Sequence, residues 1–434
     1  MSTTIDSVKS TIGSVQYAIS CLSDYDPNAL PVADANRVIR SLAMPLQGVE
    51  TLAVRDALGR VLAADLVSPI DVPGHDNSAM DGWAFRASDL NTGAETILTE
   101  IGTAFAGGAF AGDNGPGQCV RIMTGAVMPT GTDSVIPQES VQAYDKRIHI
   151  PQGQQRGQHR RLAGEDLAKG KPALLSGTWL RAAELGLAAS LGIGELQVRR
   201  RPRVAFFSTG NELRPIGQPL GNGEIYDSNR YTLWGMLTRL GCEVIDMGVV
   251  RDEPSLIEAA FREAASKADA VITTGGVSVG EADYTKGMMA RLGEVEFWTL
   301  AMRPGRPMAF GRVSDGEKTA LLFGLPGNPV AVMVTFYFFV RGALLAMAGR
   351  KDTELPMLRA PAAMPMKKKT GRTEYLRGIV ANTDGEWRVR LTGPQGSGIL
   401  NSMSQANCFV VLRHEQGNVA AGELVDVLLM DGLV

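Results

Sequence analysis

Short apolar runs alternate with helical patterns between residues 201 and 350. The runs are VAFFSTG at 204–210, EVIDMGVV at 243–250, ADAVITTGG at 268–276, EFWTLA, MAFG and ALLFGLPG, and helical patterns follow from Asn229, at 255–267, from Tyr284 and after Pro329. Strands that are apolar throughout are typical of a largely parallel sheet with helices on both faces. The pattern therefore predicts a doubly wound α/β domain at 201–350, whose ligands would bind beyond the carboxyl ends of its strands.

The rest of the chain predicts three further parts, so the fold class is a multidomain α/β plus β protein. Residues 46–172 contain Gly, Pro, Thr and Val in short alternating runs, which indicates a β-rich domain. This domain would be inserted into a helical linker domain made of residues 29–45 and 173–200. Residues 351–434 predict a small C-terminal β-barrel-like domain, and residues 1–28 a short amphipathic or partly disordered lead.

Composition narrows the class of protein. With 434 residues, 44% hydrophobic and 21% charged, the chain is long and apolar enough for several packed cores. A net charge of −3 argues against nucleic acid as a partner. The apolar segment 330–348 is interrupted by Arg341, which favours a buried helix over a membrane span. The four cysteines form no CxxC pair, which fits a reducing cytoplasm.

The segment VITTGGVSVGEADYTK lies between a predicted strand and a predicted helix. Backbone N–H groups at such a junction attract anions, so we expect a phosphate cradle there. Its residues would be Gly275, Gly276, Ser278 and Gly280, with Glu281 and Asp283 at the rim as oxygen ligands for Mg²⁺. A turn that needs glycine and a capping acid explains the segment equally well.

Two further loops lie next to the last predicted strands of this domain. MRPGRP precedes the strand MAFG, and GLPGNP follows the last strand. GLPGNP places Pro326, Gly327 and Asn328 before a helix, where capping alone explains the motif. In MRPGRP, Arg303 and Arg306 flank a Pro-Gly turn and have the paired donors that bind an oxyanion, although two loop arginines are more often simply solvated.

Carboxylates recur at the predicted strand ends, with Glu212 in STGNEL, Asp252 in RDEP and Asp283. Gathering three negative charges in one crevice is costly without a cation, so the pattern favours Mg²⁺ over a softer metal. The alternative is that each acid is a separate cap or surface residue.

Two clusters in the β-rich region, DNSAMDGWAF at 76–85 and RIMTGAVMPTGTDSVIPQES at 121–140, look like polar loops. Asp81, Thr124 and, further along, Asp166 would there be turn residues, and their spacing gives no reason to prefer catalysis.

Seven motifs together resemble those of the MoeA family, which includes the gephyrin E domain. They are DNSAMDGWAF, RIMTGAVMPTGTDSVIP, GEDLAKG, STGNEL, TTGGVSVGEADY, RPGRP and GLPGNP, in that order. The resemblance covers about residues 30–434, and seven motifs in register are far more specific than one. It implies an elongated homodimer of four-domain subunits, with each active cleft shared between the α/β domain of one subunit and the inserted domain of the other.

The resemblance also implies residue roles. Asp81, Thr124 and Asp166 would reach the cleft from the partner subunit. The nucleotide side would be lined by Glu212, Asp252 and Asp283, and molybdate would be bound by Arg303, Arg306, Arg377 and Ser397.

The implied reaction is the Mg²⁺-dependent insertion of molybdate into molybdopterin-AMP with release of AMP. Further partners would be a molybdopterin adenylyltransferase and apo-molybdoenzymes. The sequence departs from the family at Arg303, Arg306 and Thr299, where lysines are common, and at Ala331, where serine is frequent.

Three other functions stay open. The departures fit a paralogue that handles tungstate. A scaffold of the same fold is the alternative from another class, which the intact acidic residues argue against. The third is adenylylation of molybdopterin, because the α/β domain resembles that of the MogA adenylyltransferases.

Overall fold

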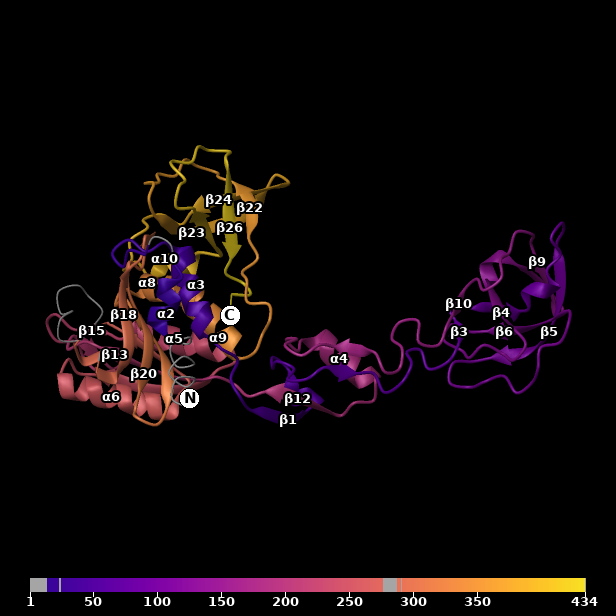
Figure 1. The fold of residues 1–434 in the computed structure, drawn as a ribbon. Helices are drawn as coiled ribbons and strands as arrows, with labels where there is room; N and C mark the ends of the chain where they lie inside the picture. Colours follow the sequence, from indigo (N-terminus) through magenta and orange to yellow (C-terminus); the bar gives the residue numbers. More distant parts are fainter. Residues whose placement is uncertain (1–13, 23–24, 276–286, 290, 434) are drawn as a thin grey trace. The chain divides into compact units, whose positions relative to one another are not determined.

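The computed structural model describes residues 14–22, 25–275, 287–289 and 291–433. The chain divides into two compact units (Figure 1). Unit 1 comprises residues 1–50, 59–63 and 197–434, and unit 2 comprises residues 51–58 and 64–196. Strands β1 (Val49–Ala53) and β12 (Glu195–Arg199) span two of the points at which the chain passes from one unit to the other.

A six-stranded sheet with the order β16-β13-β17-β21-β20-β18 forms the centre of unit 1. Its strands are β13 (Arg203–Thr209), β16 (Glu243–Val250), β17 (Ala270–Thr274), β18 (Gly293–Thr299), β20 (Pro307–Ser314) and β21 (Thr319–Leu325). The first four strands in this order are parallel, whereas β20 runs antiparallel to both β21 and β18. The sheet confirms the α/β domain predicted from the alternating pattern.

The direction of β20 decides what reaches the carboxyl edge of this sheet. Strands β13, β17 and β21 end there at Thr209, Thr274 and Leu325. Because β20 is antiparallel, its first residue, Pro307, lies at the same edge, opposite Thr299 at the end of β18. Loops that follow three strands and the loop that precedes a fourth therefore meet at one edge.

Helices pack on both faces of the sheet, as Figure 1 shows for α6 (Pro254–Lys267) and α5 (Ser228–Arg239). Alternate strand residues serve the two cores, with Phe206 packing in the cluster that contains α5 and Phe207 in the one that contains α6. Two-sided burial explains why these strands are apolar throughout.

A long apolar helix crosses the first of these cores. It consists of α8 (Pro329–Thr335), a π-helical turn η4 (Phe336–Val340) and α9 (Arg341–Met347). Its mean hydropathy of 2.0 would suit a membrane span, but 72% of the apolar window is buried within the protein. Buried Arg341 donates to the carbonyl oxygens of Leu433 and Thr353. The segment is therefore a core helix, as its interruption by Arg341 suggests.

The described part of the N-terminal lead packs on the edge strand β18. Helix α2 (Val15–Ser20) is tied to it by the Val15 amide, which donates to Glu294 Oε2 at 3.0 Å. Leu30 pairs with Leu300, and α3 (Val32–Leu42) lies in the core shared with α5 and α9. Of the two alternatives for the lead, residues 15–20 thus form a helix, and the proposed linker-domain boundaries stay a prediction.

The C-terminal sheet of unit 1 has the order β19-β23-β25-β26-β22, with β24 paired to β23. Its elements are β19 (Met302–Arg303), β22 (Leu358–Pro361), β23 (Thr373–Thr383), β24 (Glu386–Leu391), β25 (Cys408–Leu412) and β26 (Leu424–Leu429), accompanied by α10 (Asn401–Gln405). The short strand β19 comes from the α/β segment and pairs in parallel with β23, so the two parts are joined beside the carboxyl edge.

Unit 2 is built on a six-stranded sheet with the order β7-β4-β6-β5-β9-β8, which confirms the β-rich prediction. Its strands are β4 (Gly82–Phe85), β5 (Thr96–Ala104), β6 (Gln118–Ile122), β7 (Ser134–Pro137), β8 (Gln142–Tyr144) and β9 (Arg147–Ile150). Smaller elements of this unit are β2 (Leu66–Val67), β3 (Asn77–Ser78), β10 (Arg160–Arg161), β11 (Pro172–Leu174), the 3-10 turns η1 (Val54–Ala57), η2 (Ala87–Asp89) and η3 (Gln138–Ser140), and helix α4 (Ala182–Ser190).

Candidate functional site

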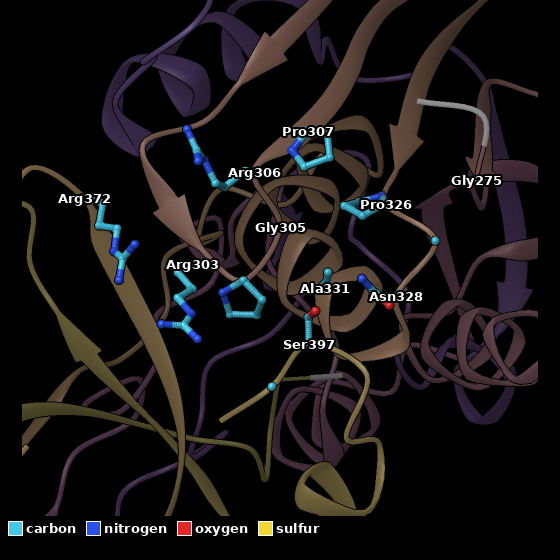
Figure 2. A pocket seen from close by; sticks show the side chains of 13 residues that line it. Gly275, Arg303, Gly305, Arg306, Pro307, Pro326, Asn328, Ala331, Arg372 and Ser397 are labelled. Carbon is cyan, nitrogen blue, oxygen red and sulfur yellow. The ribbon is translucent and has the colours of Figure 1, made fainter. Parts of the chain in front are cut away.

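A cavity of about 640 Å³ opens at the carboxyl edge of the α/β sheet (Figure 2). It is lined by Gly275, Arg303, Pro304, Gly305, Arg306, Pro307, Pro326, Gly327, Asn328, Ala331, Arg372, Gly396 and Ser397. Among the described residues that line it are three arginines and no carboxylate, so the described part of the lining suits an anion. The predicted residues Arg303, Arg306, Pro326 and Ser397 meet here.

The turn between β19 and β20 presents Arg303 and Arg306 to the cavity. Gly305 in this turn has a φ of +92°, and a Cβ atom there would approach Thr335 Cγ2 to 2.7 Å. Only glycine fits this position without displacing the helix. Figure 2 shows that Arg303 and Arg372 extend toward one another and that Arg306 extends away from this pair.

Sequence analysis missed Arg372, which reaches the cavity from the C-terminal domain. Pairing of β19 with β23 sets Met302 opposite Thr373, which places Arg372 beside Arg303. Its guanidinium bonds to the buried carboxylate of Glu374 at 2.7 Å, and its carbonyl oxygen accepts a bond from Lys368 Nζ at 2.6 Å. The paired residues of β19 and β23, such as Met302 and Thr373, are far apart in the sequence, so no local pattern could identify Arg372.

Arg377, expected at the oxyanion, is placed elsewhere. Its side chain is completely buried and outside the cavity lining. The guanidinium donates to Ser402 Oγ at 3.0 Å and to the carbonyl oxygens of Gln395 and Gly396 at 3.3 and 2.9 Å. Burial, and then the charge of Arg303, lowers the pKa of Arg377 to about 10. These hydrogen bonds make Arg377 a residue that holds the loop carrying Ser397.

The loop of Ser397 is also tied to the α/β domain. The Val330 amide, in the first turn of α8, donates to the Ser397 carbonyl oxygen at 3.1 Å. Asn328 occupies the N-cap position of α8, as predicted, yet its side chain makes no capping hydrogen bond within the described chain. It lines the cavity instead, beside Ala331 (Figure 2).

A second cavity of about 320 Å³ adjoins the first and shares Gly275, Gly327 and Asn328 with it. It is further lined by Thr209, Glu212, Leu213, Ile225, Tyr226, Asp227, Ser228, Asn229, Thr274 and Pro329. Strands β14 (Leu213–Arg214) and β15 (Ile225–Tyr226) form its outer wall. The sheet edge thus carries a basic hollow next to an acidic one.

Glycine at the ends of two strands keeps this second cavity open. Gly275 has a φ of +86°, and a Cβ atom there would lie 2.6 Å from the Thr209 carbonyl oxygen. At Gly210, a Cβ atom would lie 2.6 Å from Glu212 Oε2, so the glycine leaves room for that carboxylate. The expected phosphate loop begins at Gly275, but Gly276, Ser278, Gly280, Glu281 and Asp283 lie outside the described residues.

The predicted cluster of three carboxylates is represented in the described chain by Glu212 and Asp252. Glu212 lines the second cavity. Asp252 is outside both linings, and its amide donates to Asn211 Oδ1 at 3.4 Å. Within the described ranges, no group of three or more His, Cys, Asp or Glu side chains is arranged to hold a metal ion.

Asp227 and Asn229 are among the residues of the second cavity that were not predicted. Asp227 Oδ1 accepts a bond from the Arg230 amide at 3.1 Å and so caps α5. Asn229 Nδ2 donates to the Gly327 carbonyl oxygen at 2.7 Å. The sequence IYDSN contains an ordinary capping signal, which conceals that these side chains also line a cavity.

Unit 2 holds the remaining predicted residues. The amide and hydroxyl groups of Thr124 both donate to Asp81 Oδ1 at 2.7 Å, and these bonds lower the pKa of the exposed Asp81 carboxyl. Asp166 is exposed, and its amide donates to the Val72 carbonyl oxygen. The structure therefore pairs Asp81 with Thr124, and the two loops that carry them are linked by hydrogen bonds.

The fold and site define a multidomain protein with an arginine-lined cavity at the carboxyl edge of a doubly wound domain. Family models match most of the chain: the MoeA N-terminal region (domains I and II) at residues 30–192, a probable molybdopterin-binding domain at 205–346 and the MoeA C-terminal region (domain IV) at 359–430. The chain belongs to the MoeA family.

Relatives agree with this membership. A molybdopterin molybdenumtransferase of Haemophilus influenzae is 43% identical over 395 residues, covering 90% of this chain and 96% of the relative. One from Nostoc is 35% identical, covering 92% and 93%. The crystal structure of a molybdopterin biosynthesis MoeA protein from Pyrococcus horikoshii superposes with a TM-score of 0.78 at 29% identity, covering 92% of this chain and all of that one.

Proposed function

We propose that this protein is a molybdopterin molybdenumtransferase, which inserts molybdate into adenylylated molybdopterin and releases AMP. The observation that carries the proposal is the arginine-lined cavity, since an oxyanion substrate needs such a hollow beside its acceptor. The names of the relatives at 43% and 35% identity support the same reaction.

The arginine cavity would bind and orient molybdate. Arg303 and Arg372 approach it from two domains, and Ser397 adds a polar group on its wall (Figure 2). Arginine donors fixed before the anion arrives stabilise negative charge without reorganisation. Pairing with Glu374 fixes Arg372, and the hydrogen bonds of Arg377 hold the Ser397 loop.

The adjoining cavity would hold the part of the substrate that carries the phosphates. The Glu212 carboxylate, which Gly210 accommodates, is the oxygen-donor type that Mg²⁺ requires. We propose that Glu212 and Asp283 hold Mg²⁺, which would neutralise phosphate charge as AMP leaves. Asp252 would lie on the nucleotide side, and the loop from Gly275 to Gly280, with Pro326 and Gly327, would contact the phosphates.

The decisive experiment follows AMP release from molybdopterin-AMP by the purified protein with Mg²⁺, titrated with molybdate and separately with tungstate. Release that depends on molybdate is expected. A preference for tungstate would reassign the protein to tungsten handling. Substrate binding without release would indicate a scaffold, and consumption of ATP with free molybdopterin would indicate an adenylyltransferase.

We further propose that the protein acts as a cytoplasmic homodimer, with Asp81, Thr124 and Asp166 completing the site of the partner subunit. Their exposure on unit 2 supports this role, because exposed polar side chains on loops are available to a substrate. A molybdopterin adenylyltransferase would supply the substrate, and apo-molybdoenzymes would receive the product.

Mixing two inactive variants tests the shared site. We expect Asp81→Ala and Glu212→Ala proteins, each inactive alone, to recover about a quarter of the wild-type activity after subunit exchange, since one site per mixed dimer would be intact. Mixtures no more active than either variant would mean that each site is built within one subunit.

A further inference from the structure

Two residues that line the second cavity carry acceptor oxygens that no described residue satisfies. These oxygens are Asp227 Oδ2 and Asn229 Oδ1, both fully buried atoms without a hydrogen-bond partner among the described residues. The Asp227 residue as a whole is only 4% exposed. Native proteins rarely leave a buried carboxylate oxygen unpaired, because the lost hydration is not repaid.

Helix capping does not account for Asp227. Its Oδ1 atom already caps α5 through the Arg230 amide. Serine or threonine would cap as well as aspartate without burying a second oxygen. The Oδ2 atom is therefore costly to the fold and unnecessary for the cap, which is the signature of a group retained for a ligand.

The orientation of Asn229 is fixed by its other hydrogen bond. A carbonyl oxygen can only accept, so the amide end facing the Gly327 carbonyl oxygen must be Nδ2. Oδ1 is then the opposite end of the group. The two residues that carry these acceptors, Asp227 at the N-cap of α5 and Asn229 in its first turn, thus line one cavity.

We propose that Asp227 and Asn229 form an acceptor pair that binds two neighbouring N–H or O–H donors of the substrate. The inference rests on the proposed function, which supplies two such donor pairs in molybdopterin-AMP. One is the N–H edge of the pterin, with its ring N–H and amino group, and the other is the diol of the AMP ribose. Adenine has no such pair of donor groups, because its one amino group is flanked by acceptor nitrogens.

Charge separates this role from those of the neighbouring groups. A carboxylate repels phosphate and molybdate, so the pair would not bind the anionic parts of the substrate. It lies in the acidic hollow, next to the basic hollow for molybdate and joined to it by the Asn229 bond to Gly327. The pair would therefore fix the substrate's orientation relative to the oxyanion.

Binding measurements without turnover test the proposal, using Asp227→Ser, which keeps the cap and removes Oδ2. Pterin fluorescence gives the affinity for pterin and for lumazine, which has a carbonyl in place of the amino group. Calorimetry gives the affinity for AMP and for 2′,3′-dideoxy-AMP. We expect the variant to lose about 30-fold in affinity for either pterin or AMP, the value for a hydrogen bond to a charged group.

The analogues identify the donor. Wild-type discrimination against lumazine that disappears in Asp227→Ser would assign the pterin edge, and the same result with dideoxy-AMP would assign the ribose. The matched control is Asp315→Ser, which also removes a carboxylate that accepts backbone N–H groups, but in the turn at the opposite end of β20. Urea unfolding would verify that both variants remain folded.

Two results would overturn the proposal: unchanged affinity for both pterin and AMP, or a loss confined to Mg²⁺ binding. Either leaves the proposed function intact if molybdate still triggers AMP release. Conversely, Asp227-dependent discrimination in a protein that never releases AMP would sustain the acceptor pair and refute the transferase.

Discussion

Arginines at the cavity rim and cationic residues inside the C-terminal domain belong to segments that the pairing of β19 with β23 joins, but they differ in their partners. Arg303 and Arg306 are exposed and line the cavity. Arg377 and Lys368 are buried, and each donates to three oxygen atoms of nearby loops. The arginines at the rim have N–H groups that can bind a ligand, whereas the N–H groups of the buried cations bind oxygen atoms of the protein itself.

The difference shows that residue type alone does not identify an anion ligand. The family resemblance assigns Arg377 and Arg303 the same role, yet the Arg377 guanidinium supports the loop that carries Ser397. Arg372 combines both situations, because it lines the cavity while paired to Glu374. If a cation donates to the protein, its loss should destabilise the fold. If it donates to the substrate, its loss should weaken substrate binding.

The largest effect is expected for Arg377→Ala, as a loss of stability. Removing the guanidinium leaves the oxygens of Gln395, Gly396 and Ser402 without their donor in a buried place. We expect the free energy of unfolding to fall by about 4 kcal/mol. Urea unfolding measures it, with exposed Arg390→Ala as the control in the same domain. If the variant is stable but binds molybdate more weakly, Arg377 would be a molybdate ligand and not a structural residue.

Arg303→Ala should weaken molybdate binding and leave the stability of the fold almost unchanged. Loss of one charged donor costs about 2 kcal/mol of oxyanion binding, or roughly 30-fold in the KM for molybdate. The free energy of unfolding should change by no more than about 0.5 kcal/mol. Steady-state AMP release at varied molybdate measures the first quantity, and Arg388→Ala is the surface control. An equal effect of both variants on KM would mean that only overall charge matters.

The smallest effect is expected for Glu184→Gln in unit 2. This variant removes a purely structural ion pair, for comparison with the arginines of the cavity. Glu184 accepts from the Arg181 amide at 2.9 Å and from its guanidinium at 2.7 Å at the start of α4. The variant should lose about 1 kcal/mol of stability at neutral pH and no activity. Urea unfolding and AMP release measure the two.

The pH dependence of that loss follows from the Arg181 ion pair, which lowers the pKa of Glu184 from 4.5 to about 2. A lowered carboxyl pKa contributes stability that is complete above pH 4.5 and lost as the pH falls through about 2. The difference between wild type and Glu184→Gln should therefore shrink across this window. A constant difference would show that the charge of Glu184 is irrelevant.

Much of the fold was predictable because its signals are local. Apolar runs gave β13, β16 and β17, and the glycine pair after Thr274 marked the carboxyl edge. Motifs next to strand ends gave most of the cavity lining for the same reason. Asp227 could not be recognised as a cavity residue from the sequence, because its role as the N-cap of α5 already explains an aspartate at this position.

The sequence by itself determined the alternation of strands and helices, a largely parallel sheet and the family, since hydrophobic period and motif order are properties of the chain. Tertiary structure decided which arginine faces the anion cavity. The pairing of β19 with β23 brought Arg372 to Arg303, and the burial of β23 turned Arg377 inward. Register and burial depend on segments far apart in sequence, and only the folded chain brings those segments together.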